Sequence, residues 1–452
     1  MGSKHDMYIN YARSYKRRGK RGNNKNWFIL IIIIVAISLG ISAFLVIKTK
    51  VNTERKASVT PTEAAAVGLT QEEKPSPSSI PTTIPTEAPT LKPTPTDAPQ
   101  PTEEVTSDTN SDNLGEGKRS APVVAKGIYI SAGTAGSDRM NSLINLTETT
   151  EINALVIDVK GDTGKISYQM DSPLAKEIGA VTNTVSDMSA LVNTLKSKNI
   201  YLIARIVAFK DPYLAEKRHD LAIKNKDGSL FRDNNGECWV NPYNQEVWDY
   251  LVELATQAAA IGFDEIQFDY IRFSTGKGIK DADFGELAKT KSKEEIITEF
   301  TKYAYQKIKS VGVYLSADVY GTIINSTTDA GLVGQNYLEM SKYLDYICPM
   351  IYPSHFGEGN YGIKYPDLEP YNVIYKVLNA SNEKLSQIPK GEHRAIVRPW
   401  LQDFTATWVK PHMTYSSKEI REQIDGVYNS GYQEWLLWNA SCKYTKEGLL
   451  KE

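Results

Sequence analysis

From residue 123 onward, short apolar runs alternate with segments of helical periodicity, and this alternation constrains the fold more than any other feature. The apolar runs are rich in β-branched and aromatic residues, as strands are. The eight strand candidates span residues 126–132, 153–161, 200–209, 264–273, 313–321, 345–353, 394–404 and 434–441. Such repeated alternation predicts a (β/α)8 barrel, with a doubly wound open sheet as the competing fold.

Four of the intervening segments show clear helical patterns. They span residues 187–199, 244–262, 292–312 and 416–432. The last two begin with capping boxes, in which a Ser is followed three residues later by a Glu. No GxGxxG loop follows the first strand candidate, as it would in a dinucleotide-binding open sheet.

The fourth strand candidate carries the residue that we first suspect of chemistry. In GFDEIQFDYIRFS, residues 262–274, alternation predicts that Asp269 shares a face with Gln267, while Phe268 and Tyr270 share the other. Burying a lone carboxylate is costly. We therefore expect this strand to end at a wet, functional cleft.

Polar side chains recur near the ends of the other strand candidates. In a barrel, residues that perform chemistry lie at the carboxyl-terminal ends of strands and point inward. The candidate site residues are Asp158, Lys160, Arg205, Asp269, Arg272, Asp318, Tyr352, His355, Arg398, Trp400, Gln402, Asp403, Trp438 and Asn439. Converging carboxylates repel, so the pKa of one rises while that of another stays low, as two-carboxylate sugar chemistry requires.

Asp269 and Asp318 are the predicted catalytic pair. Neighbouring strands lie about 4.8 Å apart, which is compatible with the carboxyl separation of about 5–5.5 Å in retaining glycosidases. Asp158 and Asp403 would lie farther from Asp269, where they would form an inverting pair or stabilise positive charge.

Other interpretations of these residues remain open. Arg205 and Arg398 are expected to keep Asp269 ionised, but Asp–Arg pairs also close barrels without any catalytic role. Asp158, Asp269 and Asp318 would suit a divalent cation, although the sequence lacks the histidines and short DxD spacings common in such sites. The side chains that would either stack on sugars or pack in the core are Trp400, Trp435 and Trp438.

Two connections, residues 210–242 and 275–291, are too long to be simple loops. Both follow strand ends, so we expect them on the catalytic face, shaping a substrate cleft. The three cysteines form no CxxC motif and the five histidines show no ligand spacing. No cofactor or metal is therefore predicted, and the net charge of -2 gives no argument for nucleic acid.

The N-terminal part of the chain has a different character. Residues 27–47 contain no charge and are long enough to cross about 30 Å of hydrocarbon. A signal peptide is the alternative, but no A-x-A site follows. Basic residues crowd positions 1–26, so we predict a cytoplasmic tail, a transmembrane helix and an extracellular barrel. Between them, the Pro/Thr-rich residues 48–122 are predicted to be a disordered spacer.

Six ordered motifs resemble the putative glycoside hydrolase domain of bacteria, once catalogued as a domain of unknown function. They are VIDVKGD (156–162), FDEIQFDYIRFS (263–274), SADVYG (316–321), CPMIYPSHF (348–356), RPWLQDF (398–404) and WLLWNAS (435–441). The resemblance begins near Val124 and implies a barrel of the α-amylase and α-galactosidase-like assemblage. It also implies a nucleophile at the end of strand four, here Asp269, and an acid/base on strand five. Asp318 stands there, where amylases typically have Glu.

The sequence therefore predicts a membrane-anchored, extracytoplasmic glycoside hydrolase that acts on a cell-wall or extracellular polysaccharide. The anchor and spacer also fit a Gram-positive surface protein, by similarity. Two further hypotheses are a carbohydrate-binding or wall-organising barrel without activity, which the aromatic richness and the missing Glu would explain, and a metal-dependent hydrolase.

Overall fold

The structure is a computed structural model that describes residue 119 and residues 121–450. The predicted cytoplasmic tail and transmembrane helix lie outside the described residues, as does the predicted spacer apart from its last few positions. Among the described residues, no helix has the length and apolar character needed to cross a membrane.

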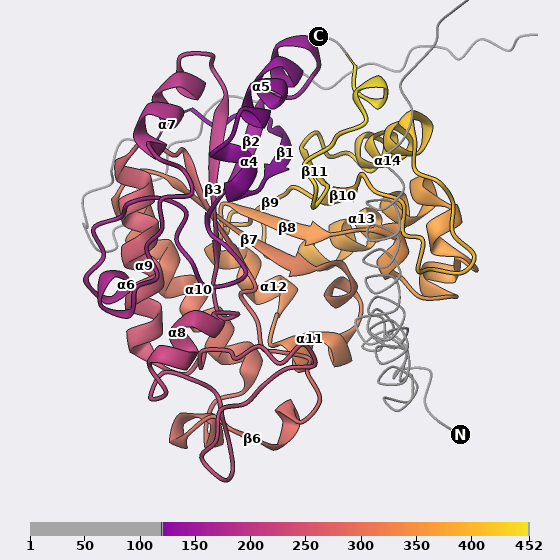
Figure 1. The fold of residues 1–452 in the computed structure, drawn as a ribbon. Helices are drawn as coiled ribbons and strands as arrows, with labels where there is room; N and C mark the ends of the chain where they lie inside the picture. The colour runs from indigo at the N-terminus through magenta and orange to yellow at the C-terminus, as the bar shows by residue number, and fades with distance from the viewer. Residues whose placement is uncertain (1–118, 120, 451–452) are drawn as a thin grey trace, which may run out of the picture. The chain divides into compact units, whose positions relative to one another are not determined.

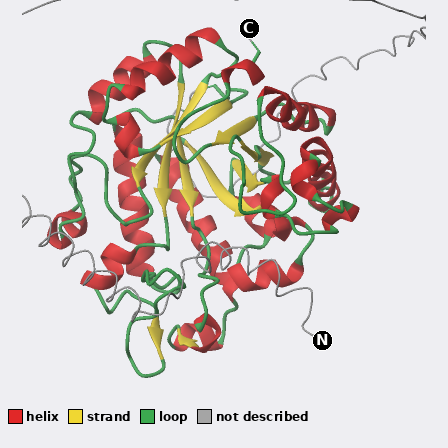
Figure 2. Ribbon diagram, turned by 45° about the vertical axis from the view of Figure 1, so that its right-hand side comes forward, coloured by secondary structure: helices red, strands yellow, loops and turns green. Residues whose placement is uncertain are grey.

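A closed barrel of parallel strands forms the centre of the fold, as the alternation predicts (Figure 2). Its strands are β1 (Lys126–Ile130), β2 (Ala154–Lys160), β3 (Tyr201–Val207), β5 (Glu265–Asp269), β7 (Tyr314–Tyr320), β8 (Tyr346–Met350), β9 (Ile396–Val397), β10 (Trp400–Gln402) and β11 (Trp435–Trp438). The barrel closes because β10, at one end of the strand order, pairs with β8 near the other end as well as with β11, whereas an open sheet would leave β10 at an edge.

Helices surround the strands (Figure 1). They are α4 (Ala132–Ala135), α5 (Arg139–Thr149), α6 (Pro173–Ile178), α7 (Met188–Lys196), α8 (Pro212–Lys217), α9 (Gln245–Ala260), α10 (Lys293–Ser310), α11 (Thr327–Val333), α12 (Tyr337–Met340), α13 (Pro370–Leu385) and α14 (Ser417–Asn429). The four predicted helices correspond to α7, α9, α10 and α14. Both predicted capping boxes are present, Ser292 with Glu295 and Ser416 with Glu419.

The seventh stave of the barrel is interrupted, although the sequence predicts one strand over residues 394–404. Pro399 separates β9 from β10, because proline has no backbone N–H to donate to a ladder. Both pieces still pair with β8, through Ile347 with Val397 and through Met350 with Trp400. The two short strands therefore occupy one strand position in an eight-stranded barrel.

Strand β5 shows the predicted alternation as far as Asp269. Phe268 points outward and its ring lies 5.4 Å from that of Phe300 in α10. Gln267 points inward, where its Nε2 donates to Cys348 Sγ. The prediction fails at Tyr270, because β5 ends at Asp269 and Tyr270 has a φ of 50°. This left-handed conformation is costly for a non-glycine residue, and it turns the chain out of the strand.

The two long connections meet each other beyond the carboxyl-terminal ends of the strands. Each contains a two-residue strand, β4 (Lys224–Asn225) and β6 (Ala282–Asp283), and these pair antiparallel. In Figure 1, β6 lies well below the barrel strands, at the lower edge of the ribbon. The connections thus form a small lobe over the end of the barrel where the sequence predicts a site.

Candidate active site

A cavity of about 890 Å³ lies at the carboxyl-terminal ends of the barrel strands. Asp269 and Asp318 line it from β5 and β7, and Trp400 and Trp438 line it from β10 and β11. The lobe supplies Trp239 and neighbouring polar residues to its wall. The cavity therefore occupies the place where parallel barrels carry their chemistry.

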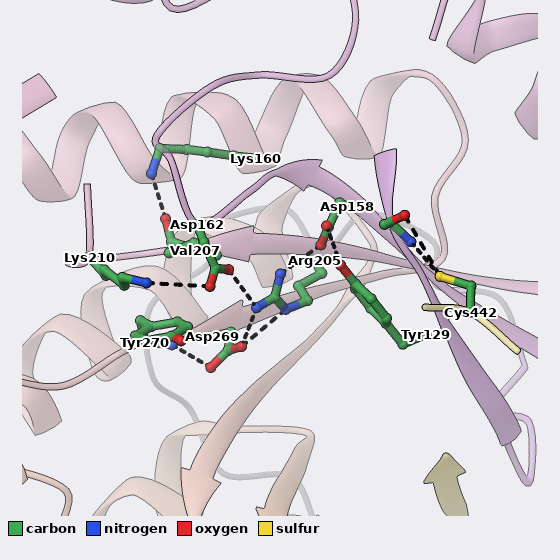
Figure 3. Close-up of polar contacts among 11 residues, drawn as sticks. Tyr129, Asp158, Lys160, Asp162, Arg205, Val207, Lys210, Asp269, Tyr270 and Cys442 are labelled. Carbon is green, nitrogen blue, oxygen red and sulfur yellow. Dashed lines mark hydrogen bonds and ion pairs between the residues drawn. The ribbon is translucent and has the colours of Figure 1, made fainter. Parts of the chain in front are cut away.

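Arg205 on β3 is the central cation of this site (Figure 3). Its side chain is almost fully buried, with a relative exposure of 1%. Its Nε and Nη2 atoms donate to Oδ2 of Asp269, at 3.0 and 2.5 Å. A fork of this kind fixes both the charge and the orientation of a carboxylate. The other oxygen of Asp269, Oδ1, accepts a hydrogen bond from the backbone N–H of Tyr270 at 2.6 Å.

Arg205 also contacts two carboxylates of the second stave. Its Nη1 donates to Asp158 Oδ1 at 2.6 Å, and its Nη2 lies 3.2 Å from Asp162 Oδ1. Tyr129 donates its hydroxyl to the other oxygen of Asp158 at 2.6 Å. Burial raises the pKa of Asp158, because desolvation outweighs Arg205. Arg205 and Lys210 instead overcome desolvation at the half-exposed Asp162 and lower its pKa.

Asp318 has a different environment from Asp269. Its relative exposure is 2%, and no Lys or Arg forms an ion pair with it among the described residues. The indole Nε1 of Trp400 donates to its Oδ1 at 2.6 Å. Burial, and then the negative charge of Asp269, raise the pKa of Asp318 well above its ordinary value. We therefore expect Asp318 to keep its proton to a higher pH than an ordinary aspartate does.

The ladder places the two carboxyls at matching heights. Phe268 on β5 pairs with Ala317 on β7, so the following residues, Asp269 and Asp318, are level neighbours. A carboxylate paired with an arginine beside a carboxyl of raised pKa is the arrangement that general acid and nucleophilic chemistry requires. No group of three or more His, Cys, Asp or Glu side chains in the described part of the chain is arranged to hold a metal ion.

Aromatic side chains form much of the remaining wall. Trp438 stacks on Tyr129, with ring centroids 4.2 Å apart, and Phe404 stacks on the partly exposed Trp408. Tyr352 also lines the cavity, beside His355. Flat apolar faces that open onto a polar cleft suit the apolar faces of sugar rings. Trp435, by contrast, is fully buried and donates its indole N–H to the hydroxyl of a helix residue, Tyr428, so it packs rather than lines the site.

The structure brings most of the sequence-predicted residues to the cavity. Those that line it are Arg205, Asp269, Arg272, Asp318, Tyr352, His355, Trp400, Trp438 and Asn439. Asp158 lies behind Arg205 and does not line the cavity. Four other predicted binding residues also lie outside it, namely Lys160, Arg398, Gln402 and Asp403.

Lys160 and Arg398 differ most from their predicted positions. Lys160 is buried and joins Val207 O and Asp211 Oδ2, at 2.6 and 2.8 Å, so it ties the barrel to the first long connection. Arg398 was expected to keep Asp269 ionised. It lies instead at the amino-terminal end of the barrel, bonded to Glu265 and Glu434. Its position before Pro399 places it low in the barrel.

The side chains of Gln402 and Asp403 form hydrogen bonds to Ser354 and Thr445 respectively. Gln402 Oε1 accepts hydrogen bonds from the backbone N–H and the hydroxyl of Ser354. Asp403 accepts from the backbone N–H and the hydroxyl of Thr445, at 2.9 and 2.7 Å. Both side chains therefore have partners within the protein, and neither faces the site.

The predicted site residues leave out several that belong to the site, among them Tyr129, Asp162, Lys210 and Tyr270. Asp162 and Lys210 follow directly after strands, so their position is a signal that can be read in the sequence. Tyr129 alternates with Ile128 and Ile130, like an ordinary core residue. Tyr270 was assigned to the outer face because alternation cannot register a left-handed turn.

Known proteins resemble this chain in sequence and in fold. The model of a family described as putative glycosyl hydrolase domain matches residues 127–444, more than half of the chain. A hypothetical protein from Ruminiclostridium thermocellum is 42% identical, over 42% of this chain and 97% of that protein, with a TM-score of 0.40. The glycoside hydrolase domain of PgaB from Bordetella bronchiseptica is 11% identical, over 70% of this chain and 94% of that one, with a TM-score of 0.50.

The second of these likenesses shows a shared fold and nothing more, because the identity is low. An α-galactosidase from Thermus thermophilus is 12% identical over 72% of this chain and 60% of its own, with a TM-score of 0.44. A comparison with curated proteins gives no match.

Proposed function

Because this chain belongs to the family of putative glycosyl hydrolase domains, we propose that it is a glycoside hydrolase whose catalytic carboxyls are Asp269 and Asp318. The observation that carries the proposal is the contrast between them. Asp269 accepts two hydrogen bonds from Arg205, whereas Asp318 has a raised pKa and no cationic partner among the described residues. Both line the same cavity.

Asp269 is the nucleophile in this proposal. The fork from Arg205 holds Oδ2, and the N–H of Tyr270 orients Oδ1. Each carboxylate oxygen accepts about two hydrogen bonds. Oδ1 therefore keeps a lone pair with which to attack the anomeric carbon, and the ion pair keeps the carboxylate charged until the bond forms.

Asp318 is the general acid. Trp400 Nε1 occupies Oδ1, which leaves Oδ2 to carry the proton. In the first step the proton moves from Asp318 to the glycosidic oxygen as the bond between that oxygen and the anomeric carbon breaks. Asp269 forms an ester with the sugar in the same step.

The second step restores the enzyme. Asp318, now a carboxylate, takes a proton from water as the water oxygen attacks the anomeric carbon. The ester bond to Asp269 breaks and its electron pair returns to the carboxylate. The products are a free sugar end and the enzyme in its starting protonation state, so protons and electrons balance over the cycle.

The test is hydrolysis of a glycan panel by the full chain, with release of reducing ends as the measurement. We expect turnover of at least one glycan, and its loss in Asp269→Asn and Asp318→Asn. Asp249→Asn is the matched control, because Asp249 is an exposed residue of α9. Full activity in Asp269→Asn would contradict the assignment of Asp269 as the nucleophile. Binding of many glycans without turnover would favour a carbohydrate-binding barrel instead, for which the aromatic wall of the cavity is the supporting feature.

Membrane attachment is a separate part of the proposal. The uncharged run at residues 27–47 and the basic residues before it support an anchor with the barrel outside the cell. Protease added to intact cells should digest the barrel and leave the N-terminal tail protected. Protection of the barrel in intact cells would contradict this orientation.

A further inference from the structure

Three cationic side chains line the cavity, and two of them are neutralised by carboxylates. Arg205 pairs with Asp158, Asp162 and Asp269. Lys210 lies 3.5 Å from an oxygen of Asp162 and 3.1 Å from one of Glu237. Arg272 is the third, and no described carboxylate lies within ion-pair distance of it.

Arg272 is held by aromatic rings instead. Its guanidinium carbon lies 4.7, 4.8 and 5.1 Å from the ring centroids of Tyr320, Tyr270 and Trp239. The residue is only 8% exposed. Its one hydrogen bond within the described protein runs from Nη1 to the backbone oxygen of Phe273, at 2.9 Å.

The remaining donors of Arg272 are open to the cavity. Its Nε and Nη2 atoms have no protein partner, yet neither is among the buried polar atoms that lack one, so both are accessible. A guanidinium removed from bulk water without an anion is costly, and cation–π contacts recover only about 0.5–2 kcal/mol each. Because the rings fix the guanidinium plane, its fork is ready to receive an anion.

Resting on the proposed function, we infer that Arg272 binds an anionic substituent, a carboxylate or a phosphate, of the glycan held next to Asp269. Planar bidentate recognition of such groups is characteristic of arginine. Arg272 and Asp269 both contact Tyr270, on either side of its left-handed turn. The substrate class is therefore an acidic polysaccharide, and Arg272 is a specificity residue of the site.

The test measures binding, so it does not depend on hydrolysis. Glucuronate, glucose 6-phosphate, glucose and inorganic phosphate are titrated into the full chain in detergent and followed by calorimetry. We expect an anionic sugar to bind at least about tenfold more tightly than glucose, which corresponds to about 1.4 kcal/mol. The first two ligands distinguish carboxylate from phosphate, and inorganic phosphate reports binding without a sugar.

Arg272→Gln should abolish this preference, and Arg272→Lys should retain part of it because the charge remains. Arg232→Gln is the matched control, because Arg232 lies in the same lobe but is exposed and paired with Glu216. Equal binding of glucose and both anionic sugars by the native chain would overturn the inference. So would a preference that survives in Arg272→Gln.

If Arg272→Gln does not fold, Arg272→Lys decides the question, since an undiminished preference in that variant would overturn the role of the planar fork. Failure of the proposed function would look different. The native chain would then prefer anionic sugars but hydrolyse none of the glycans.

Discussion

The two ends of the barrel interior each contain a buried arginine surrounded by carboxylates, but they differ in whether every carboxyl has a cationic partner. At the amino-terminal end, Arg398 lies between Glu265 and Glu434, with Tyr346 against its guanidinium at 3.6 Å. Arg398 and Glu265 are fully buried, and neither lines the cavity. At the carboxyl-terminal end, Arg205 faces three carboxylates and a fourth, Asp318, lies beyond its reach.

The same strand contributes to both clusters, since Glu265 begins β5 and Asp269 ends it. The amino-terminal end, which we call the closed end because its residues do not line the cavity, uses its carboxylates to neutralise Arg398 and to link strands; the carboxyl-terminal end is the open end. At the carboxyl-terminal end, one carboxyl, Asp318, forms no ion pair among the described residues and lines a cavity. A carboxyl without a cationic partner beside a cavity, rather than an Arg–Asp contact as such, is what distinguishes a candidate catalytic cluster from a structural one.

The largest expected effect is on turnover at the open end. Replacing Asp269 with Asn removes the charged nucleophile while keeping its shape and the Tyr270 contact. We expect kcat to fall by about 10⁴-fold, in the range seen when a catalytic carboxylate is removed. Initial rates on the most active glycan of the panel measure this. A loss of less than about tenfold would remove the distinction between the two clusters.

Asp318→Asn should reduce kcat by about 10³-fold, since general acid catalysis contributes about 10²–10⁴-fold. Glycosides with a nitrophenolate leaving group need no proton in the first step, so the variant should release a burst of nitrophenolate at a near-native rate. Its steady turnover should stay slow, because the second step still needs Asp318 as the base. In the native enzyme kcat/KM should fall as pH rises through the raised pKa of Asp318, and this limb should vanish in the variant. An unchanged alkaline limb would assign it to another group.

The closed end should respond in stability rather than in catalysis. Arg398→Met leaves Glu265 and Glu434 buried without their cation, so we expect the free energy of unfolding to fall by about 3–5 kcal/mol. The folded fraction should keep its kcat. Arg218→Met, which removes surface ion pairs of a half-buried arginine, is the control and should change stability by less than about 1 kcal/mol. Loss of kcat in folded Arg398→Met would show that the two ends are coupled.

The smallest effect concerns stability against pH. The folded pKa of Asp318 is raised above its unfolded value of about 3.9, so the neutral carboxyl contributes stability that is complete below that value and is lost as pH rises toward the folded pKa. Native stability should fall by up to about 1.4 kcal/mol per pH unit in this window. Urea unfolding should show that the free energy of unfolding of the native chain falls, relative to that of Asp318→Asn, as pH rises through this window. A constant difference would mean that Asp318 ionises normally.

The sequence contained enough information for the barrel and for several residues that line its cavity. Strand periodicity, capping boxes and the order of elements are local properties, so they could be read without the fold. Asp269 and Asp318 were found because each lies near the end of a strand. The height of a residue in the barrel depends on register and breaks, which is why Arg398, before Pro399, was placed at the wrong end.

The sequence also could not show which partner each polar side chain contacts. Lys160 follows Asp158 by two residues and is equally suited to the site by its position in the sequence, but it forms an ion pair with Asp211 on the next connection. The left-handed turn at Tyr270 leaves no signal in side-chain alternation. Both depend on contacts between segments that are distant in the chain, and pattern reasoning treats each segment separately.

The protonation of Asp318 in the resting protein tests the central claim most directly. Infrared difference spectra of the native chain and Asp318→Asn, both with ¹³C-labelled aspartate carboxyls, report whether a carboxyl is protonated. We predict a protonated carboxyl band in the native chain that persists well above the pH at which an ordinary aspartate ionises, disappears in Asp318→Asn and remains in Asp249→Asn. If Asp318→Asn loses no such band, Asp318 is not the acid and the account of the carboxyl-terminal end is wrong.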